Sequence, residues 1–317
     1  MEEKAEYTTE GEMNIKSLYH SCMNAYYGAQ KRRIAMSNAI RVFVLQYKGI
    51  LPTRRVPDKK DKDKKAYGKY NDKWVQEEFM KIVDAANDVD REALLRFYGI
   101  YDKTLNIERD CKLFALYILE KQPIYSKWLT HVRGIGPVLS LNLVHRLGHC
   151  ERFSTVSKLW KYAGMHVVNG EAPRRKKGEK LNFNKEVRVM MFKVMDCFIK
   201  QRSTPYREIY DTEKQIQLEM MEKKTKGAPE SKMHAELRAR RYAGKIFLTH
   251  YWMCARHLIG EPLPAPYSVR VLNHTDILPP PEWHRVFGSS PPWEEWGATA
   301  ISVKEFTEQR KRQKLGA

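Results

Sequence analysis

The stretch Trp128–Met165 constrains the fold most, because it sets two glycines and a proline between apolar segments: WLTHVRGIGPVLSLNLVHRLGHCERFSTVSKLWKYAGM. Glycine permits a tight turn that a Cβ would obstruct, which applies to Gly134 and Gly136. Proline suits the first position of a helix, which applies to Pro137. We therefore expect an apolar helix before the turn and a second helix from Pro137 to about Arg146. This arrangement is a helix-hairpin-helix.

The turn also predicts a binding site for an anion. A helix that opens in this way leaves its first backbone N–H groups without partners, and the positive end of its dipole attracts negative charge. Arg133 stands beside the turn, and Ile135 is expected to point inward as an apolar anchor. The sequence thus favours a site for one nucleic-acid phosphate, formed by Arg133, Gly134, Ile135 and Gly136. A plain helical hairpin, which needs no ligand, is the alternative.

The charge of the chain independently favours a nucleic-acid partner. Its 317 residues include 57 lysines and arginines against 38 acidic residues, a formal net charge of +19. Such a charge repels itself in the folded state, and a polyphosphate is the simplest partner that offsets it. A membrane surface is the competing partner, but no apolar run approaches the roughly 20 residues of a spanning helix. The acidic, polar start is unlike a signal peptide, and the five cysteines are scattered. We expect a cytoplasmic protein with reduced thiols.

The extended pattern resembles the C-terminal half of the RNA-guided insertion-sequence transposases with DEDD catalytic residues, also called bridge-RNA recombinases. The matching motifs are Arg133-Gly134-Ile135-Gly136-Pro137, Gly148 with Arg152-Phe153, and Leu159-Trp160-Lys161-Tyr162-Ala163-Gly164. The resemblance covers roughly residues 105 to 260. That region is related in turn to the Nop-type RNA-binding fold of box C/D ribonucleoproteins and of the TIGR-Tas proteins. The resemblance implies a structured guide RNA as partner and DNA as the target. We also expect a homo-oligomer.

Two departures from the family pattern concern catalysis. The family places a nucleophilic serine in a short loop where this chain has Asn169, and an amide cannot act as that nucleophile. The family's N-terminal ribonuclease-H-like domain, with its four carboxylates, has no recognisable counterpart in this sequence. Ser140, Ser154 and Ser157 remain, without an adjacent base or arginine cradle in the sequence. We therefore expect a non-catalytic nucleic-acid-binding protein, a guide-RNA scaffold. An active transposase, recombinase or nuclease is the alternative.

Basic segments after the hairpin supply the other candidate contacts. Lysine and arginine bind phosphates, and arginine can also form a bidentate contact with guanine. The candidate residues are Arg174, Arg175, Lys176, Lys177, Lys180, Lys185, Arg188, Arg238, Arg240, Arg241 and Lys245. A solvated basic surface is the alternative. His250, Cys254 and His257 share a helical face but lack the fourth ligand of a structural zinc site, so we expect neither a metal nor a cofactor.

The expected fold class is all-α, with four regions along the chain. These are a flexible acidic tail at 1–13, a helical region at 14–122 with a basic loop at 49–73, the helix-hairpin-helix domain at 123–260, and an extension at 261–317. The basic loop is either a plain exposed loop or a segment that orders on RNA through its lysines and aromatic residues.

Prolines dominate the last of these regions. They exclude regular helix there, so the sequence predicts an irregular segment anchored to the helical body by Trp283, Trp293 and Trp296. A basic amphipathic tail closes the chain.

Overall fold

The computed structural model describes residues 15–50, 70–168, 170–174, 178, 180–201, 204–288 and 291–316. Internal packing divides the chain into two compact units, Met1–Leu116 and Tyr117–Ala317. Regular structure in the described residues is helical apart from one pair of two-residue strands, which confirms the all-α class. None of the helices in these ranges is both long enough and apolar enough to cross a membrane.

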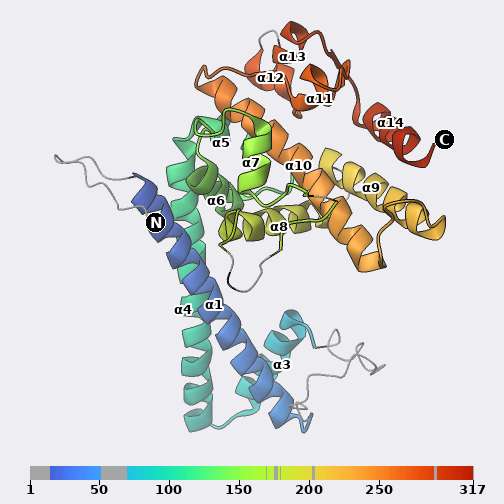
Figure 1. Cartoon of the computed structure of the whole chain (residues 1–317). Coiled ribbons are helices and arrows are strands. Elements are labelled where there is room, and N and C mark those ends of the chain that lie inside the picture. Colours follow the sequence, from blue (N-terminus) through green and yellow to red (C-terminus); the bar gives the residue numbers. More distant parts are fainter. Residues whose placement is uncertain are drawn as a thin grey trace, which may run out of the picture. The chain divides into compact units, whose positions relative to one another are not determined.

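The first unit contains α1 (Ile15–Tyr47), α3 (Asp72–Ala85) and the first part of α4 (Asp88–Glu120). Figure 1 shows α3 lying against α1 and α4, which run alongside each other. The core at that place contains Val44 of α1, Phe79 of α3 and Tyr101 of α4. Asn71 begins α3, since its side chain accepts the N–H of Trp74. Most of the predicted basic loop, residues 51–69, lies outside the described residues.

The second unit is built around helix α10 (Lys232–Leu258). The helices that precede it are α5 (Pro123–Lys127), α6 (Pro137–Leu147), α7 (Val156–Tyr162), α8 (Lys185–Lys200) and α9 (Pro205–Glu222). Figure 1 shows α7, α8 and α9 against α10. Ala235, Ala239 and Ala243 are completely buried along α10. Small side chains at this spacing let a neighbouring helix approach closely.

The C-terminal half of α10 holds the loop between α6 and α7 by side-chain donors. The indole Nε1 of Trp252 donates to the carbonyl of Phe153 at 2.7 Å, and the Tyr251 hydroxyl donates to that of Gly148 at 2.9 Å. Arg256, which is 4% exposed, donates to the carbonyl of Cys150 at 3.2 Å. Buried carbonyls need such partners, so these bonds fix where α7 begins.

The proline-rich extension is more regular than the sequence predicted. It contains α11 (Tyr267–Arg270), β1 (Asp276–Ile277), α12 (Trp283–Phe287), α13 (Pro292–Glu295), β2 (Thr299–Ala300) and α14 (Val303–Leu315). The expectation of no regular helix was wrong because proline is compatible with helix starts. Pro266 precedes α11, and Pro292 is the first residue of α13. Trp283 and Trp293 are buried, each 2% exposed.

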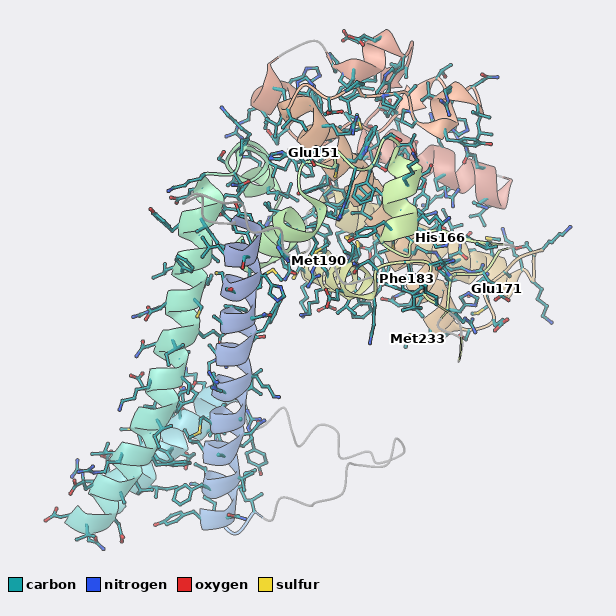
Figure 2. The ribbon with its side chains drawn as sticks, turned by 60° about the vertical axis from the view of Figure 1, so that its left-hand side comes forward. Glu151, His166, Glu171, Phe183, Met190 and Met233 are labelled. Atoms are coloured by element: carbon teal, nitrogen blue, oxygen red, sulfur yellow. The ribbon has the colours of Figure 1, made fainter. Side chains whose placement is uncertain are left out.

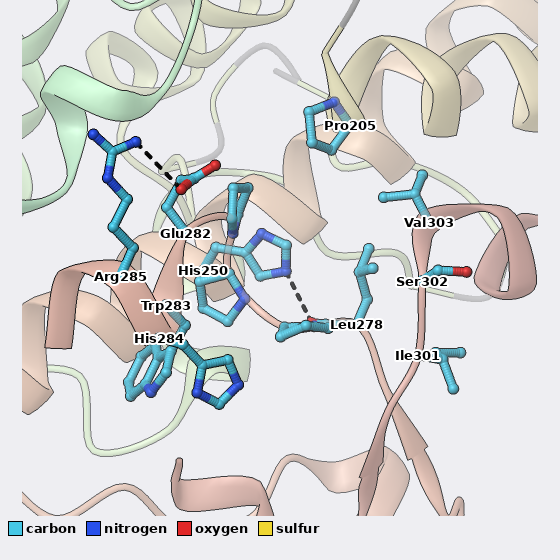
Figure 3. Close-up of a pocket in the computed structure, with 13 residues that line it drawn as sticks. Pro205, His250, Leu278, Glu282, Trp283, His284, Arg285, Ile301, Ser302 and Val303 are labelled. Carbon is cyan, nitrogen blue, oxygen red and sulfur yellow. Dashed lines mark hydrogen bonds and ion pairs between the residues drawn. The ribbon is translucent and has the colours of Figure 1, made fainter. Parts of the chain in front are cut away.

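His250 of α10 links the helical body to this extension. Its Nδ1 lies 2.9 Å from the Tyr206 hydroxyl, and its Nε2 lies 3.1 Å from the Leu278 carbonyl, as the close-up in Figure 3 shows for the second bond. Burial lowers the pKa of His250 from 6.5 to about 4, although the Leu278 carbonyl acts in the opposite direction. The folded state therefore favours the neutral imidazole.

We predict that acid destabilises the protein through His250. The folded-state pKa lies below the unfolded one. The contribution of His250 to the free energy of unfolding is therefore fully present above pH 6.5 and is lost as the pH falls towards 4. The loss at this group is up to about 3 kcal/mol. Urea unfolding at a series of pH values measures it. His250→Gln, which keeps a hydrogen-bonding side chain but does not titrate, should flatten the pH dependence between 4 and 6.5. An unchanged slope in this variant would contradict the assignment.

Candidate nucleic-acid interface

The segment before the glycine turn differs from the continuous apolar helix that the sequence predicted. It consists of the short α5 and one 3-10 turn, η1 (Leu129–His131). Trp128 separates them with φ −122° and ψ −51°. Its indole is completely buried, and Nε1 donates to the carbonyl of Pro281 at 3.1 Å. Packing of this ring overrides the local helical propensity. The second helix was predicted correctly, because α6 begins at Pro137 and ends at Leu147.

The two glycines of the turn have different roles. Gly134 has φ +99°, and a Cβ built there would lie 3.1 Å from Cγ of Gln201 and 3.4 Å from Cδ1 of Phe198. Only glycine adopts this backbone without strain. Gly136 has φ −86° and ψ 175°, and a Cβ there would meet open space. The expectation that a Cβ would obstruct the turn at both positions is therefore wrong for Gly136. Ile135, between them, is 8% exposed and points inward as predicted.

The backbone at the start of α6 presents unpaired amides. Gly136 is the N-cap residue and is exposed. It has no side chain that could accept a bond from the first amides of the helix. The amide of Ser140 is the first to bond inside the helix, to the carbonyl of Gly136 at 2.9 Å. Within the described residues, the amides of Val138 and Leu139 have no hydrogen-bond partner. Arg133 beside them is exposed. This geometry suits a phosphate oxygen.

A second group of candidate residues gathers on one side of α10. Arg238, Arg241 and Lys245 follow each other at spacings of three and four residues, which places them on the same helix face. Among the described residues, Arg238 donates to three groups, none of them a carboxylate: Nε2 of His234 at 3.1 Å, Oε1 of Gln217 at 3.2 Å and the carbonyl of Gly227 at 2.6 Å. These bonds orient the guanidinium but leave its charge uncompensated.

Arg241 and Lys245 have still fewer partners. Among the described residues, no hydrogen bond or ion pair is made by the guanidinium of Arg241. The Lys245 ammonium lies 4.9 Å from the centroid of the Trp160 ring, a cation–π contact. Burial lowers the pKa of both side chains. The neighbouring cations Arg238 and Arg188 lower the pKa of Arg241 further, although Glu213 acts against them.

Arg188 of α8 and Arg174 of the preceding loop belong to the same group. Arg188 donates to the carbonyl of Pro173 at 2.6 Å and stacks 4.9 Å from the centroid of the Phe183 ring. Burial lowers its pKa. Arg174 is exposed, and together with Arg238 and Arg241 it lowers the pKa of His234 beyond the effect of burial. We call Arg174, Arg188, Arg238, Arg241 and Lys245 the basic cluster.

His166 borders the basic cluster and was not among the residues predicted from the sequence. Figure 2 shows His166 near Phe183, whose ring lies against Gly164. Burial lowers the pKa of His166, and Lys161, Lys245 and Arg188 lower it further. Both ring nitrogens are buried, and neither has a hydrogen-bond partner in the part of the chain that the structure describes. Its position two residues after Gly164, the last residue of the Leu159–Gly164 motif, was the signal that could have identified it.

The structure does not bring all the candidate residues into the basic cluster. Arg240 lies on another side of α10, where its Nε is 2.9 Å from Glu236 and its Nη1 is 3.7 Å from Asp196. Lys180 and Lys185 are exposed. The glycine turn lies against the C-terminal end of α8, whereas Arg188 lies near its N-terminal end. The candidates that lie outside the described residues are Arg175, Lys176 and Lys177.

The serines that remain as candidate nucleophiles lie in different environments. Ser140 is completely buried in α6, which removes it from any substrate. Ser154 was expected to lack an adjacent base, but Nζ of Lys158 lies 2.7 Å from its Oγ. Both side chains are exposed, and an ammonium donates hydrogen bonds without accepting them. Asn169, in the position of the family's serine, lies outside the described residues.

The histidines and cysteine of the α10 face are used in packing. His250 is hydrogen-bonded to the Tyr206 hydroxyl and the Leu278 carbonyl. Cys254 is completely buried, which raises the pKa of its thiol well above the ordinary value. Over the residues that the structure describes, no three His, Cys, Asp or Glu side chains form a group that could hold a metal ion.

Comparison with known proteins connects the turn and part of the basic cluster to one family. Residues 126–211, about a quarter of the chain, match the family model of the transposase IS116/IS110/IS902 family. This region is therefore transposase-related, which supports a nucleic-acid function. Searches of curated proteins and of solved structures found no match.

The two glycines give a matched pair of substitutions. Gly134→Ala should lower the free energy of unfolding by about 1–3 kcal/mol, because alanine is strained at φ +99°. Gly136→Ala should change it by less than about 1 kcal/mol, since its φ is ordinary and the space is open. Urea titrations of the two variants measure the difference. Equal losses would show that the turn is not formed as described.

The uncompensated charge of the basic cluster predicts a stabilising substitution. Arg241→Met should raise the free energy of unfolding at low salt by about 1 kcal/mol, because it removes a repelled, partly buried cation. Arg240→Met, one position earlier, should lower it by about 1–2 kcal/mol through loss of the Glu236 bond. Thermal and urea unfolding of both variants at low and high salt provide the test. A destabilised Arg241→Met would show that its charge is compensated.

Proposed function

We propose that the second unit binds a structured guide RNA through its phosphate backbone and that base pairing by this RNA selects a DNA target. The observation that carries the proposal is the basic cluster. Arg241 and Lys245 lie near Arg188 and Arg238. No carboxylate among the described residues forms an ion pair with any of the four. Holding like charges together costs stability, so such a cluster indicates a polyanionic ligand.

The turn and the basic cluster would contribute in the same way, through phosphates. At the turn, the amides of Val138 and Leu139 and the side chain of Arg133 would hold one phosphate. In the cluster, arginines would contact phosphates in bidentate fashion. Neither element reads a base sequence, which fits recognition of RNA by shape. The proposed scaffold is similar to the Nop-like RNA-binding domain, and the sequence choice rests with the paired RNA.

We propose that the protein acts in this way without breaking a bond. The chain has an asparagine where the related transposases carry their nucleophilic serine. Ser154 accepts a hydrogen bond from the exposed ammonium of Lys158. An ammonium has no lone pair, so it cannot remove the proton of the Ser154 hydroxyl. The basic cluster supplies binding and no nucleophile, because neither arginine nor protonated lysine acts as one at neutral pH.

Binding should depend steeply on salt, and each lost phosphate contact should reduce that dependence. For an RNA hairpin, Arg241→Met or Lys245→Met should lower the slope of log K against log salt by about 0.7–0.9 in magnitude. Arg240→Met is the matched control and should retain the wild-type slope, because Glu236 already pairs with its charge. Fluorescence anisotropy from low to high salt measures the slopes, with a DNA duplex of matched length as a second probe. A wild-type affinity that does not change with salt would refute the proposed function.

Strand transfer is the second candidate function. It is favoured by the match of residues 126–211 to a transposase family, and Ser154 is the exposed serine that it would use. The test is incubation with supercoiled DNA and magnesium, followed by separation of nicked and linear products. Nicking that is lost in Ser154→Ala would replace the scaffold proposal. DNA that stays supercoiled both without and with the RNA would support the scaffold proposal.

A further inference from the structure

A pocket of about 630 Å³ opens beside the basic cluster, between α7, α10, the segment before β1, and α14. Its volume is in the range of sites that hold small organic ligands. The lining is mixed. The aromatic side chains are Trp160, Tyr242 and Phe306, and the uncharged polar ones include Thr249, Ser268, Asn273, Gln309 and Gln313. The other lining residues include the apolar Val156, Ile246, Pro266, Ile277 and Leu278 and the charged Asp276, Arg310 and Arg312. We call this the α7–α14 pocket.

The aromatic rings of the pocket are held in place by their neighbours. Nε1 of Trp160 donates to the carbonyl of Lys245 at 3.2 Å, so the indole has a fixed orientation. Tyr242 and Phe306 lie nearly parallel, with an angle of 21° between their planes and 6.4 Å between their centroids. Rigid aromatic faces of this kind stack with nucleobases, since every base has a π-face of its own.

The polar groups of the pocket complement a base edge. Asn273 and Gln313 each carry a donor and an acceptor, and both residues are exposed. The amide of Gln309 is already used in part, because its Nε2 donates to Asp276 at 2.8 Å. Nucleobases present the same combination of donors and acceptors along their edges, so amide side chains are well suited to hydrogen-bond them.

Lys245 joins the pocket to the basic cluster. Its ammonium stacks on Trp160, which lines the pocket, and Arg241 of the cluster lies close enough to lower its pKa. Arg310 of the pocket also lowers the pKa of Lys245, and its guanidinium lies 4.4 Å from the Tyr242 ring centroid. Glu213 accepts a bond from Arg310 at 2.9 Å, so that charge is compensated. Arg312 also lines the pocket from an exposed position of α14, and no carboxylate among the described residues forms an ion pair with it. Uncompensated cations therefore lie both beside Trp160, at Lys245, and on the α14 side of the pocket.

We propose that the α7–α14 pocket receives one unstacked nucleobase of the bound strand, while Lys245 and Arg241 hold the phosphate next to it. A base and its phosphate are covalently linked, which matches an aromatic, amide-lined pocket that adjoins an uncompensated cationic surface. A neutral apolar ligand would leave these cations without a role. This inference rests on the proposed function, because it specifies how the nucleic acid is held.

The test separates the contribution of the base to binding from that of the phosphates. Two labelled single strands of twelve nucleotide units are compared by fluorescence anisotropy: one of thymidines, and one in which every unit is abasic. Both carry the same phosphate charge. The wild-type protein should bind the thymidine strand about tenfold more tightly, the gain expected for one base stacked on aromatic rings. Equal affinities would overturn the pocket proposal and leave the proposed function standing. If neither strand binds at low salt but the RNA hairpin does, the pocket proposal fails; if the hairpin does not bind either, the proposed function itself fails.

Ser268→Trp, which fills the pocket, should lower the affinity for the thymidine strand to that for the abasic strand and leave the abasic affinity unchanged. Ser126→Trp, at an exposed position of α5 outside the pocket, is the matched control and should change neither. Phe306→Ala is a second variant, which removes one stacking face without adding bulk, in case the first does not fold. A uniform loss for both strands in the folded variants would refute the assignment of the pocket.

Discussion

The second unit depends on the burial of α10. Along its N-terminal half, alanines at a spacing of four residues face the core, and along its C-terminal half Phe247, Leu248, Trp252 and Met253 are buried as well. Burial of side chains of this size contributes about 1.5–3 kcal/mol each. The donors of this half also satisfy the carbonyls of the loop at 148–153, so a single helix supplies both the apolar core and the polar anchors of the hairpin region.

This core allows α10 to carry an unfavourable face. Burial lowers the pKa of Arg241 and Lys245, and neighbouring cations lower it further: Arg238 acts on Arg241, and Arg241 acts on Lys245. A helix without a buried apolar side would relieve such repulsion by local unfolding. Here the same residues are fixed by the packed side of the helix, so the cationic face is preorganised. Preorganisation reduces the ordering cost of binding, and it is obtained at the expense of stability in the free protein.

Much of the fold could be predicted from the sequence, because helical periodicity and caps are local signals. Pro137 as a helix start and the inward position of Ile135 are examples. The continuous helix expected before Gly134 is instead divided into α5 and η1 at Trp128, whose indole bonds to Pro281, more than 150 residues away. Local patterns carry no information about such distant contacts.

The candidate interface was only partly predictable for the same reason. The sequence marks Arg240 and Arg241 as equivalent neighbours. One of them faces Glu236 and Asp196, and the other faces Arg188 and Arg238. Helical geometry alone predicts that the two diverge, but the charges they meet come from α8 and from the preceding turn of α10. The α7–α14 pocket was missed altogether, because its walls are contributed by segments between Val156 and Gln313.

The separation between the turn and the basic cluster determines what kind of ligand can engage both. Gly134 lies against Phe198 and Gln201 at one end of α8, and Arg188 lies near the other end. The twelve residues from Arg188 to Lys200 correspond to about 18 Å along the helix. That is about five nucleotide steps of a duplex strand at 3.4 Å each. A free phosphate or a mononucleotide can therefore occupy one of the two sites, whereas a polynucleotide can occupy both. The geometry thus favours a ligand that runs along α8 over one held at a single point.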